Sequence, residues 1–494
     1  MKALLRTAAF AMSGLAVAAC STDPPVAVKP SEMPTAFTAP VDSGTATAQV
    51  WPATDWWTGF SSAELTGLET SARQNNLDLA AAAARVMQAR GNTGIAASAL
   101  FPAVDLQSSA QRGASSVPIA NGKHIVTTGN SFGLSLNASY ELDFWGLAQD
   151  NLRSAQNSAR AALYAQRVVA LTVTADVANT YFDVLALRER IAIAKNNLDA
   201  AKRVLAIIEA KVANGVSSNL DLAQQRAVVA AVEAAIPNLE EQEREARYAL
   251  AVLQGRVPEG FDVKGQTLEG LVPPTVSPGI PAALLTRRPD IAEAEASLVA
   301  AHADVDAARA AFLPAIGLTG AGGYASTAIS SLINPSSLAW SIGASLLQTV
   351  FDGGAKTSAS DVARGREMEL VATYRSTVFN ALSDVESSLG QVSSLAKQEA
   401  FTAEQVKNAA EAFRISELQY REGVTDLLAV LQSQQALFTG QDTLVQIQLA
   451  RLQSNISLYR ALGGGWTLDQ DKDAPTRNDF QPVPILSAGD MLKG

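Results

Sequence analysis

Residues 210–222 read AKVANGVSSNLDL, and residues 418–430 read LQYREGVTDLLAV. Each segment contains a Gly-Val pair, Gly215-Val216 or Gly423-Val424, that ends a 68-residue stretch without proline and with at most two glycines. After each glycine of the pair a second helical stretch of 39 residues, 216–254 or 424–462, runs up to Gly255 or Gly463. Equal lengths in both halves predict an internal repeat of about 208 residues.

The repeated stretches predict two long helical hairpins. An unbroken helix of 68 residues would be about 100 Å long, and apolar residues such as Val177, Val184 and Leu198 recur at helical spacing. This stripe is typical of a coiled-coil seam. The glycines suit the tips of the hairpins, because a residue that ends a helix commonly needs a positive φ. Pro237 predicts a kink or an interruption in the first return helix.

Upstream of each hairpin the pattern changes to a period of two. Residues 131–142, SFGLSLNASYEL, alternate apolar and polar side chains, and weaker alternation occurs at 104–107, 316–319 and 340–346. We expect four strands of about 9 to 12 residues, the length of a tilted strand that crosses a membrane. An amphipathic sandwich in water is the alternative. An export signal, and the absence of a later apolar run long enough for a membrane helix, favour the membrane.

Four strands cannot close by themselves, and open sheet edges are not tolerated in lipid. The smallest membrane barrels have eight strands, so copies of the chain must pool their strands. Two copies would give a barrel filled by side chains, and three would give twelve strands and room for a conduit. The polar segments 111–130 and 323–338 are expected to join the strands outside the cell, with the long helices in the periplasm.

The N-terminus predicts export and lipidation. Lys2 and Arg6 precede an apolar run at 8–19, which is too short to span a bilayer and suits a secretory signal. The sequence Val-Ala-Ala-Cys at 17–20 resembles a bacterial lipobox, so we expect cleavage before Cys20 and a covalent lipid on its thiol and amino group. Ser21, in place of Asp, favours the outer membrane. The alternative is an ordinary signal with a stray cysteine.

The domain organisation follows from these patterns. We expect a signal peptide at 1–19, a lipidated extended tether at 20–50, a first repeat at 51–262, a second repeat at 263–466 and a polar tail at 467–494. Each repeat would contain a helix, two strands and a long helical hairpin. The predicted fold class is an α+β membrane protein.

Enzymes and nucleic-acid binders are disfavoured. The net charge of −10 lacks the basic excess of a nucleic-acid partner. The two histidines, His124 and His302, are far apart and lack metal-ligand spacing, and Cys20 is the single cysteine. We therefore expect no catalytic residues, no metal and no cofactor other than the lipid on Cys20.

Several motifs together resemble the outer-membrane efflux protein family, the TolC- and OprM-like channels and NodT-type outer-membrane factor lipoproteins. They are Trp56-Trp57 with Phe60, ALLTRRPDIAEAE at 283–295, FDGG at 351–354, YREGVT at 420–425 and LYRALGGGW at 458–466. The resemblance implies a homotrimer with a twelve-stranded β-barrel in the outer membrane and an α-helical coiled-coil tunnel in the periplasm. It also implies passive export of drugs or other small molecules, driven by an inner-membrane pump through a periplasmic adaptor protein.

Two other functions stay open. One is an exit duct for proteins in type I secretion, and the other is a lipid-anchored periplasmic scaffold of coiled coils without a pore. A scaffold would be a monomer or dimer that conducts no ions, whereas a channel would be a detergent-resistant trimer.

The resemblance also implies site residues. Gly215, Val216, Gly423 and Val424 match the hairpin tips that meet the adaptor. Leu428, Gln432 and Gln435 match positions that constrict the periplasmic entrance, with Asp426 beside them. Relatives that carry Asp at positions 429 and 432 form an acidic ring, but this chain has Ala429 and Gln432 there. We therefore expect a gate closed by Leu428 and amide hydrogen bonds, rather than a cation-sensitive ring.

The entrance would open like an iris, as the tip hairpins 216–235 and 424–440 shift when an adaptor docks. A coiled-coil seam position is the alternative for Leu428. The RRPD sequence needs no chemical role, since Pro289 and Asp290 suit the start of a helix.

Overall fold

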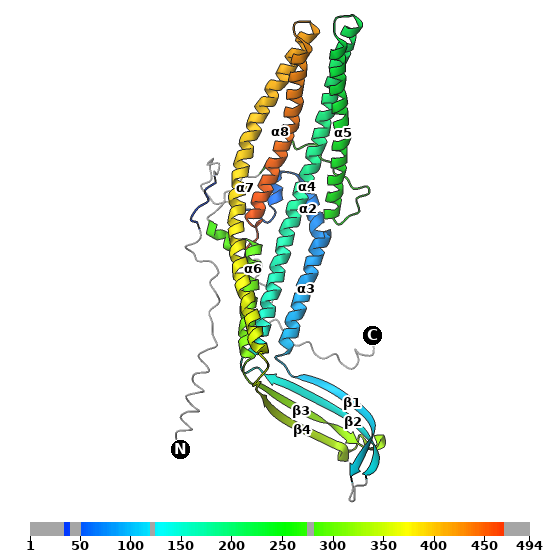
Figure 1. The fold of residues 1–494 in the computed structure, drawn as a ribbon, viewed down its shortest axis with the longest axis vertical. Helices are drawn as coiled ribbons and strands as arrows, with labels where there is room; N and C mark the ends of the chain where they lie inside the picture. The colour runs from blue at the N-terminus through cyan, green and yellow to red at the C-terminus, as the bar shows by residue number, and fades with distance from the viewer. Residues whose placement is uncertain (1–33, 40–50, 119–123, 274–280, 469–494) are drawn as a thin grey trace.

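The computed structural model describes residues 34–39, 51–118, 124–273 and 281–468 (Figure 1). The predicted signal peptide, Cys20, most of the tether and nearly all of the tail lie outside the described residues. The described elements follow one another along the chain. They are η2 (Trp56–Phe60), α2 (Ala63–Asn75), α3 (Leu77–Ser98), β1 (Ala103–Pro118), β2 (His124–Leu142), α4 (Leu147–Ala213), α5 (Asn219–Leu253), η4 (Pro281–Thr286), α6 (Pro289–Ala310), β3 (Ala315–Ser326), η5 (Ile329–Ser331), η6 (Pro335–Ser337), β4 (Leu338–Leu347), α7 (Ala355–Arg421) and α8 (Leu427–Ala461).

The predicted internal repeat is present. Corresponding helices have equal lengths: 22 residues in α3 and α6, 67 in α4 and α7, and 35 in α5 and α8. The long helices run side by side, with the hairpin tips at one end of the molecule and the four strands at the other (Figure 1). The sequence therefore predicted the helical hairpins almost to the residue.

Two apolar clusters hold these helices together. At mid-height, Trp56, Phe60 and Phe182 are buried with residues of α5 and α8, so the aromatic motif near residue 56 is part of the core. Nearer the tips, α4, α7 and α8 bury Ile208, Phe413 and further residues along a seam. Both clusters join the first repeat to the second.

Helix α4 corrects one expectation. It contains an 18-residue window whose length and composition would allow it to cross a membrane, although no such run was expected. Half of that window is buried within the chain. Burial against neighbouring helices explains its apolar composition, since a helix that is apolar on several faces suits a protein core.

Helix α5 continues through Pro237, so the predicted interruption is absent, and the predicted kink stays a prediction. Proline removes one backbone hydrogen bond from the helix. Ion pairs flank it on both sides: Lys202 pairs with Glu233 at 2.7 Å, and Lys195 pairs with Glu240 at 2.9 Å. These ion pairs join α5 to α4 above and below the proline.

The four strands form one antiparallel sheet in the order β1-β2-β3-β4. Strands β1 and β2 have 16 and 19 residues and are longer than expected. The assignment of 111–130 to a connecting segment was wrong, because residues 111–118 pair with residues 124–131. Strand β3 likewise continues to Ser326, inside the expected segment 323–338. Polar Ser and Thr side chains do not end a strand whose backbone groups are paired with a neighbour.

Candidate functional site

The two hairpin tips have the same backbone geometry. Gly215 and Gly423 adopt positive φ angles of 71° and 78°. The N–H of Val216 donates to Lys211 O at 2.8 Å, and that of Val424 donates to Gln419 O at 2.8 Å. This is the pattern of a Schellman motif, which explains the need for glycine. Both valines are about three-quarters exposed, at 73% and 74%.

Capping residues fix where each return helix begins. Ser218 caps α5 in a capping box with Asp221, and Asp426 caps α8 by accepting from the Ala429 N–H at 3.1 Å. Hydrogen bonds from the Ser217 hydroxyl and the Ser218 backbone hold the pKa of Asp221 below its ordinary value. The carboxylates of Asp221 and Asp426 are thus both engaged in local structure.

The tips contact each other through residues that the sequence did not single out. Lys211 of α4 donates to the backbone oxygen of Tyr420 in α7, and its ammonium lies 4.3 Å from the Tyr420 ring centroid. The hydroxyls of Ser217 and Tyr420 are 3.4 Å apart. Tyr420 lies in the YREGVT motif. It follows Lys211 by 209 residues, close to the repeat length, so the two residues occupy nearly corresponding positions at the two tips. This spacing is the one feature of the sequence that could have indicated their contact.

The predicted gate residues lie on one exposed face of α8. Leu428, Gln432 and Gln435 follow at helical spacing and are exposed in the isolated chain, and Leu428 is 58% exposed. Its neighbour Leu427 is only 4% exposed and occupies the seam with α4 and α7. Leu428 therefore lies outside the seam formed within this chain. Gln435 Nε2 donates to Thr439 Oγ1 at 2.9 Å.

Further from the tips, an ion pair links the two hairpins again. Arg190 of α4 binds both carboxylate oxygens of Asp442 in α8, at 2.6 and 3.2 Å. Asp442 also accepts from Gln446 at 2.5 Å. A shift of the α7–α8 hairpin past α4 would have to break this two-point contact.

Strand register sorts the sheet into an apolar and a polar face. Leu106, Leu136, Gly322 and Trp340 are opposed in one cross-strand row, and the next row contains Asp105, Asn137, Ala321 and Ser341. Apolar rows and polar rows alternate because successive side chains of a strand point to opposite faces. The edge strands β1 and β4 each pair with one strand only in the described part of the chain.

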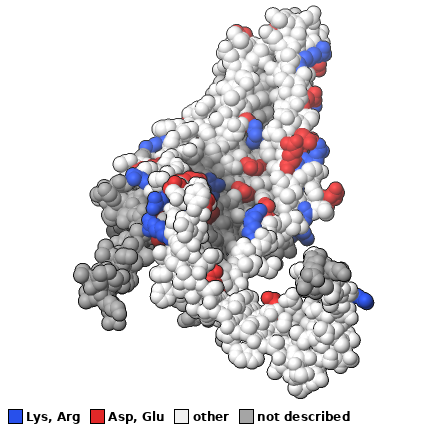
Figure 2. All heavy atoms as spheres, turned by 60° about the horizontal axis from the view of Figure 1, so that its bottom comes forward, with Lys and Arg blue, Asp and Glu red and all other residues white. Residues whose placement is uncertain are grey.

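Charge is scarce on the sheet. The four strands contain three residues of the types Asp, Glu, Lys and Arg: Asp105, Arg112 and Glu141. Figure 2 shows that the coloured charged groups on the visible face gather over the helices, whereas the end formed by the strands is nearly white. A surface with so little charge suits contact with lipid on one face and with water on the other.

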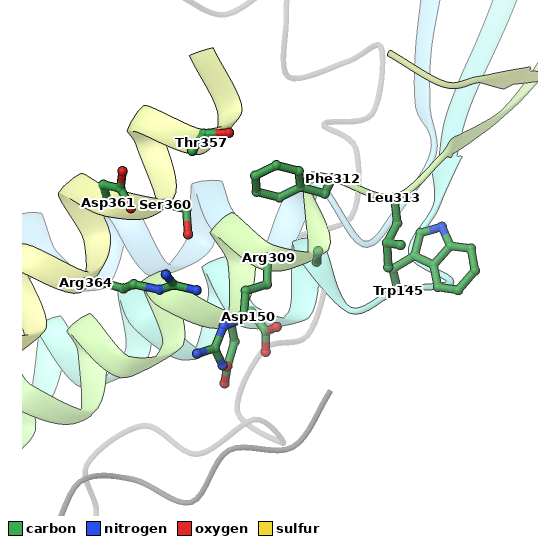
Figure 3. A pocket seen from close by; sticks show the side chains of 11 residues that line it. Trp145, Asp150, Arg309, Phe312, Leu313, Thr357, Ser360, Asp361 and Arg364 are labelled. Atoms are coloured by element: carbon green, nitrogen blue, oxygen red, sulfur yellow. The ribbon is translucent and has the colours of Figure 1, made fainter. Parts of the chain in front are cut away.

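A cavity of about 600 Å³ lies where α4, α6 and α7 meet the sheet. Trp145, Phe312 and Leu313 lie on the side of the strands, and Arg309, Arg364 and Asp150 point in from the helices (Figure 3). The Trp145 indole donates to Pro314 O at 2.7 Å, which fixes the ring at the junction. The arrangement joins the helices to the sheet.

The histidines are accounted for structurally. His302 Nδ1 lies 2.7 Å from Glu367 Oε1, and this contact joins α6 to α7. His124 is exposed at the start of β2, opposite Pro118. Among the described residues there is no cluster of His, Cys, Asp and Glu that could hold a metal ion.

Comparisons with known proteins agree with this arrangement. The model of a family described as outer membrane efflux protein matches residues 68–256 and 280–464, one range in each repeat. The pyoverdine export outer membrane protein OpmQ of Pseudomonas aeruginosa is 39% identical over 451 residues, which cover 87% of this chain and 94% of that protein. The cation efflux system protein CusC of Escherichia coli O6:H1 is 30% identical over 455 residues, which cover 92% of this chain and 97% of that protein.

A solved structure shares the fold. The outer-membrane channel OprN superposes with a TM-score of 0.81 at 27% sequence identity, and the match covers 88% of this chain and 98% of that chain.

Proposed function

The chain belongs to the outer membrane efflux protein family, and from this premise we propose that three copies form the outer-membrane channel of a tripartite efflux system. The channel would carry drugs or other small molecules passively across the outer membrane, with its helical part in the periplasm. No catalytic step is required, because an energised pump elsewhere would supply the driving force.

One observation carries the proposal: an amphipathic sheet with two open edges lies at the foot of long helices. Unpaired backbone groups of β1 and β4 would be costly in lipid, so the edges of neighbouring copies must pair. Three copies of four strands give a twelve-stranded barrel, which leaves a conduit. The apolar row with Trp340 would face lipid, and the polar row with Ser341 would face the lumen.

The partners follow from the helical end. A periplasmic adaptor would dock on the tips, where Val216 and Val424 present apolar side chains to solvent. Exposed valines on rigid turns are suitable anchors for a partner helix. The adaptor would in turn connect the channel to an inner-membrane pump.

The closed entrance would be formed by the exposed face of α8. In a trimer three copies of Leu428 would meet at the axis, with Gln432 and Gln435 forming amide hydrogen bonds below them. Asp426 caps α8 and would contribute to the helix end rather than to a cation site. Opening would require the contacts of Lys211 and Arg190 to the second hairpin to give way.

The cargo is not encoded in the fold. OpmQ is named for pyoverdine export and CusC for cation efflux, although both match nearly the full chain. We infer that the pump selects the cargo and that the sheet lumen is permissive. Export of small molecules is favoured over a protein exit duct by these names.

The remaining proposal concerns the anchor. The lipobox at 17–20 places the single cysteine where lipidation requires its thiol. Several acyl chains on Cys20 would hold the chain at the membrane far more firmly than one.

Crosslinking and conductance test the function together. Detergent-purified protein should give a covalent trimer after brief amine crosslinking, and it should conduct ions in a planar bilayer. Monomers or dimers without conductance would instead establish the scaffold alternative. Growth of a deletion strain on toxic small molecules, restored by the intact gene, would connect the conductance with export.

A further inference from the structure

A short N-terminal segment lies against α7, far along the sequence from the helix that it contacts. The Thr38 N–H donates to Glu386 Oε1 at 2.7 Å, and the Ala39 N–H donates to Oε2 at 2.8 Å. The Thr38 hydroxyl also donates to Oε1 at 3.1 Å. One carboxylate therefore holds two successive backbone N–H groups and a hydroxyl. Figure 1 draws residues 34–39 in dark blue beside α7.

Apolar contacts seat the same segment. Phe37 and Ala39 pack against a buried cluster of the second repeat that includes Leu284 and Val385. Trp51 packs against this cluster as well, and the Arg287 guanidinium lies 4.4 Å from its ring centroid. The segment is thus held by side chains on both sides of the Glu386 contact.

The carboxylate is well suited to this role. Burial by itself would raise the pKa of Glu386, but the hydrogen bonds from Thr38 and Ala39 hold it below its ordinary value. Glu386 therefore stays ionised at neutral pH. Hydrogen bonds from N–H groups to an ionised acceptor are about twice as strong as neutral ones.

The chain between Cys20 and Thr38 is only a little longer than the distance that it would have to span. Glu386 lies 31 residues into α7, so it stands about 47 Å from the end of the helix next to the sheet. Cys20 precedes Thr38 by 18 residues, and a chain of that length reaches at most about 60 Å. The available length therefore exceeds the required span by only a small margin.

We propose that Glu386 is the docking site of an N-terminal strap, residues 34–39, which ties the lipid-bearing Cys20 to the second repeat at a fixed height above the membrane. The proposal rests on the lipid anchor of the proposed function. The strap would anchor the middle of α7 to the membrane through the lipid. The barrel anchors the other end of the helices, next to the sheet.

Chymotrypsin tests the docking directly, because the bond after Phe37 adjoins the contact with Glu386. Cleavage there should be at least about tenfold faster in Glu386→Ala, since charge-assisted hydrogen bonds are lost. Glu386→Gln keeps one acceptor oxygen and should give a smaller increase. Glu369→Gln, an exposed position of α7 paired with Arg366, is the matched control and should leave the rate unchanged. Equal cleavage rates in all four proteins would refute the docking site.

A length series tests the fixed height. After deletion of residues 24–31, Thr38 follows Cys20 by ten residues, which reach about 35 Å and cannot span about 47 Å. In the lipidated protein this deletion should expose the bond after Phe37, whereas insertion of eight residues should not. The same deletion in Cys20→Ser, exported with a signal peptide cleaved before residue 20, should restore protection.

Each experiment has an outcome that would contradict one part of the proposal. Protection of the bond in the lipidated deletion variant would show that the strap carries no height constraint. Radiolabelled palmitate reports lipidation of Cys20 separately, and absence of label would overturn the tie to the membrane. Conductance of the trimer is measured in parallel, so a failure of the channel function is distinguished from a failure of the strap.

Discussion

Glu69 is a buried carboxyl group whose burial outweighs the contacts that would favour its charged form. It is fully buried in α2, and among the described residues its oxygens make no hydrogen bond of standard geometry. Burial raises its pKa to about 9, against the opposing effects of Arg73 and of the Thr174 side chain. The folded protein therefore holds a neutral carboxylic acid here at neutral pH. Because the unfolded chain releases this proton near pH 4.5, the folded state loses stability as the pH rises from there towards 9.

Glu69→Gln should remove this pH dependence. The variant keeps the shape of the neutral acid, so its thermal midpoint should exceed that of the parent protein at pH 8 and match it near pH 4. A gain of about 1 kcal/mol corresponds to about 2–4 °C in a domain of about 150–250 residues and to less in this longer chain. Thermal unfolding in detergent, followed by circular dichroism at both pH values, checks the difference. A constant offset at the two pH values would contradict the assignment to ionisation.

Glycine is required where each return helix ends. A Cβ on Gly255 would lie 2.2 Å from Asn75 O, and one on Gly463 would lie 1.8 Å from Arg287 O. Both residues also have positive φ angles, 64° and 87°. The two clashes occur at corresponding places in the repeats, so the close approach belongs to the architecture.

Gly463→Ala should destabilise the protein more than Gly260→Ala. Gly260 also has a positive φ, 74°, but a Cβ there would meet nothing within 4 Å. Its substitution should cost about 1–2 kcal/mol for the backbone conformation alone. Gly463→Ala adds a backbone clash and should lower the thermal midpoint several degrees further. The yield of detergent-stable trimer provides a second readout, and equal losses in both variants would be inconsistent with the close approach.

At the scale of elements, each repeat has a hydrogen bond between the start of its short helix, α3 or α6, and the end of its return helix, α5 or α8, but different residues make this bond. Asn76 Nδ2 donates to Leu253 O at 3.0 Å, and Arg288 donates to Ala461 O at 3.0 Å. In both repeats, the residue before the short helix thus binds the carbonyl of the last residue of the return helix. Arg288 further pairs with Asp384 at 3.2 Å. The RRPD sequence therefore does more than begin a helix.

Leu428→Lys should open the periplasmic entrance. In a trimer the substitution would place three charges close together around the axis, which is unfavourable when they are desolvated. Single-channel conductance should rise, and cells should take up more of a large antibiotic. Leu220→Lys is the matched control, since Leu220 is the corresponding residue of α5 and is 65% exposed. Conductance that stays at the parent level in Leu428→Lys would exclude this residue from the gate.

For the whole molecule, the sequence predicted what depends on local pattern. Helix lengths and tips followed from glycine spacing, and the faces of the strands followed from alternation. Contacts between distant residues could not be predicted, because Lys211 with Tyr420, or Glu386 with Thr38, meet only after the hairpins pack. Strand ends were misplaced for a related reason, since residues 111–118 extend through pairing rather than through apolar alternation.

In the barrel wall, adjacent residues of β4 should face different surroundings, one the lipid and the next the lumen. Ile342 shares its row with Val104 and Ala138, whereas Ser341 shares its row with Asp105 and Asn137. An arginine that faces lipid near the middle of the membrane costs about 2–4 kcal/mol, whereas an arginine in a watery lumen costs little. Ile342→Arg should therefore reduce the yield of heat-resistant trimer.

Ser341→Arg should preserve the trimer and change its conduction. Three added cations in the lumen should shift the reversal potential under a salt gradient towards anion preference. Seminative electrophoresis and planar-bilayer recording of the two variants measure assembly and selectivity. The opposite outcome, with Ser341→Arg losing the trimer and Ile342→Arg changing selectivity, would mean that the sheet presents its apolar face to the conduit. A shared cylinder with a polar bore would then be untenable, since the same twelve strands could not be both soluble in lipid and permeable to ions.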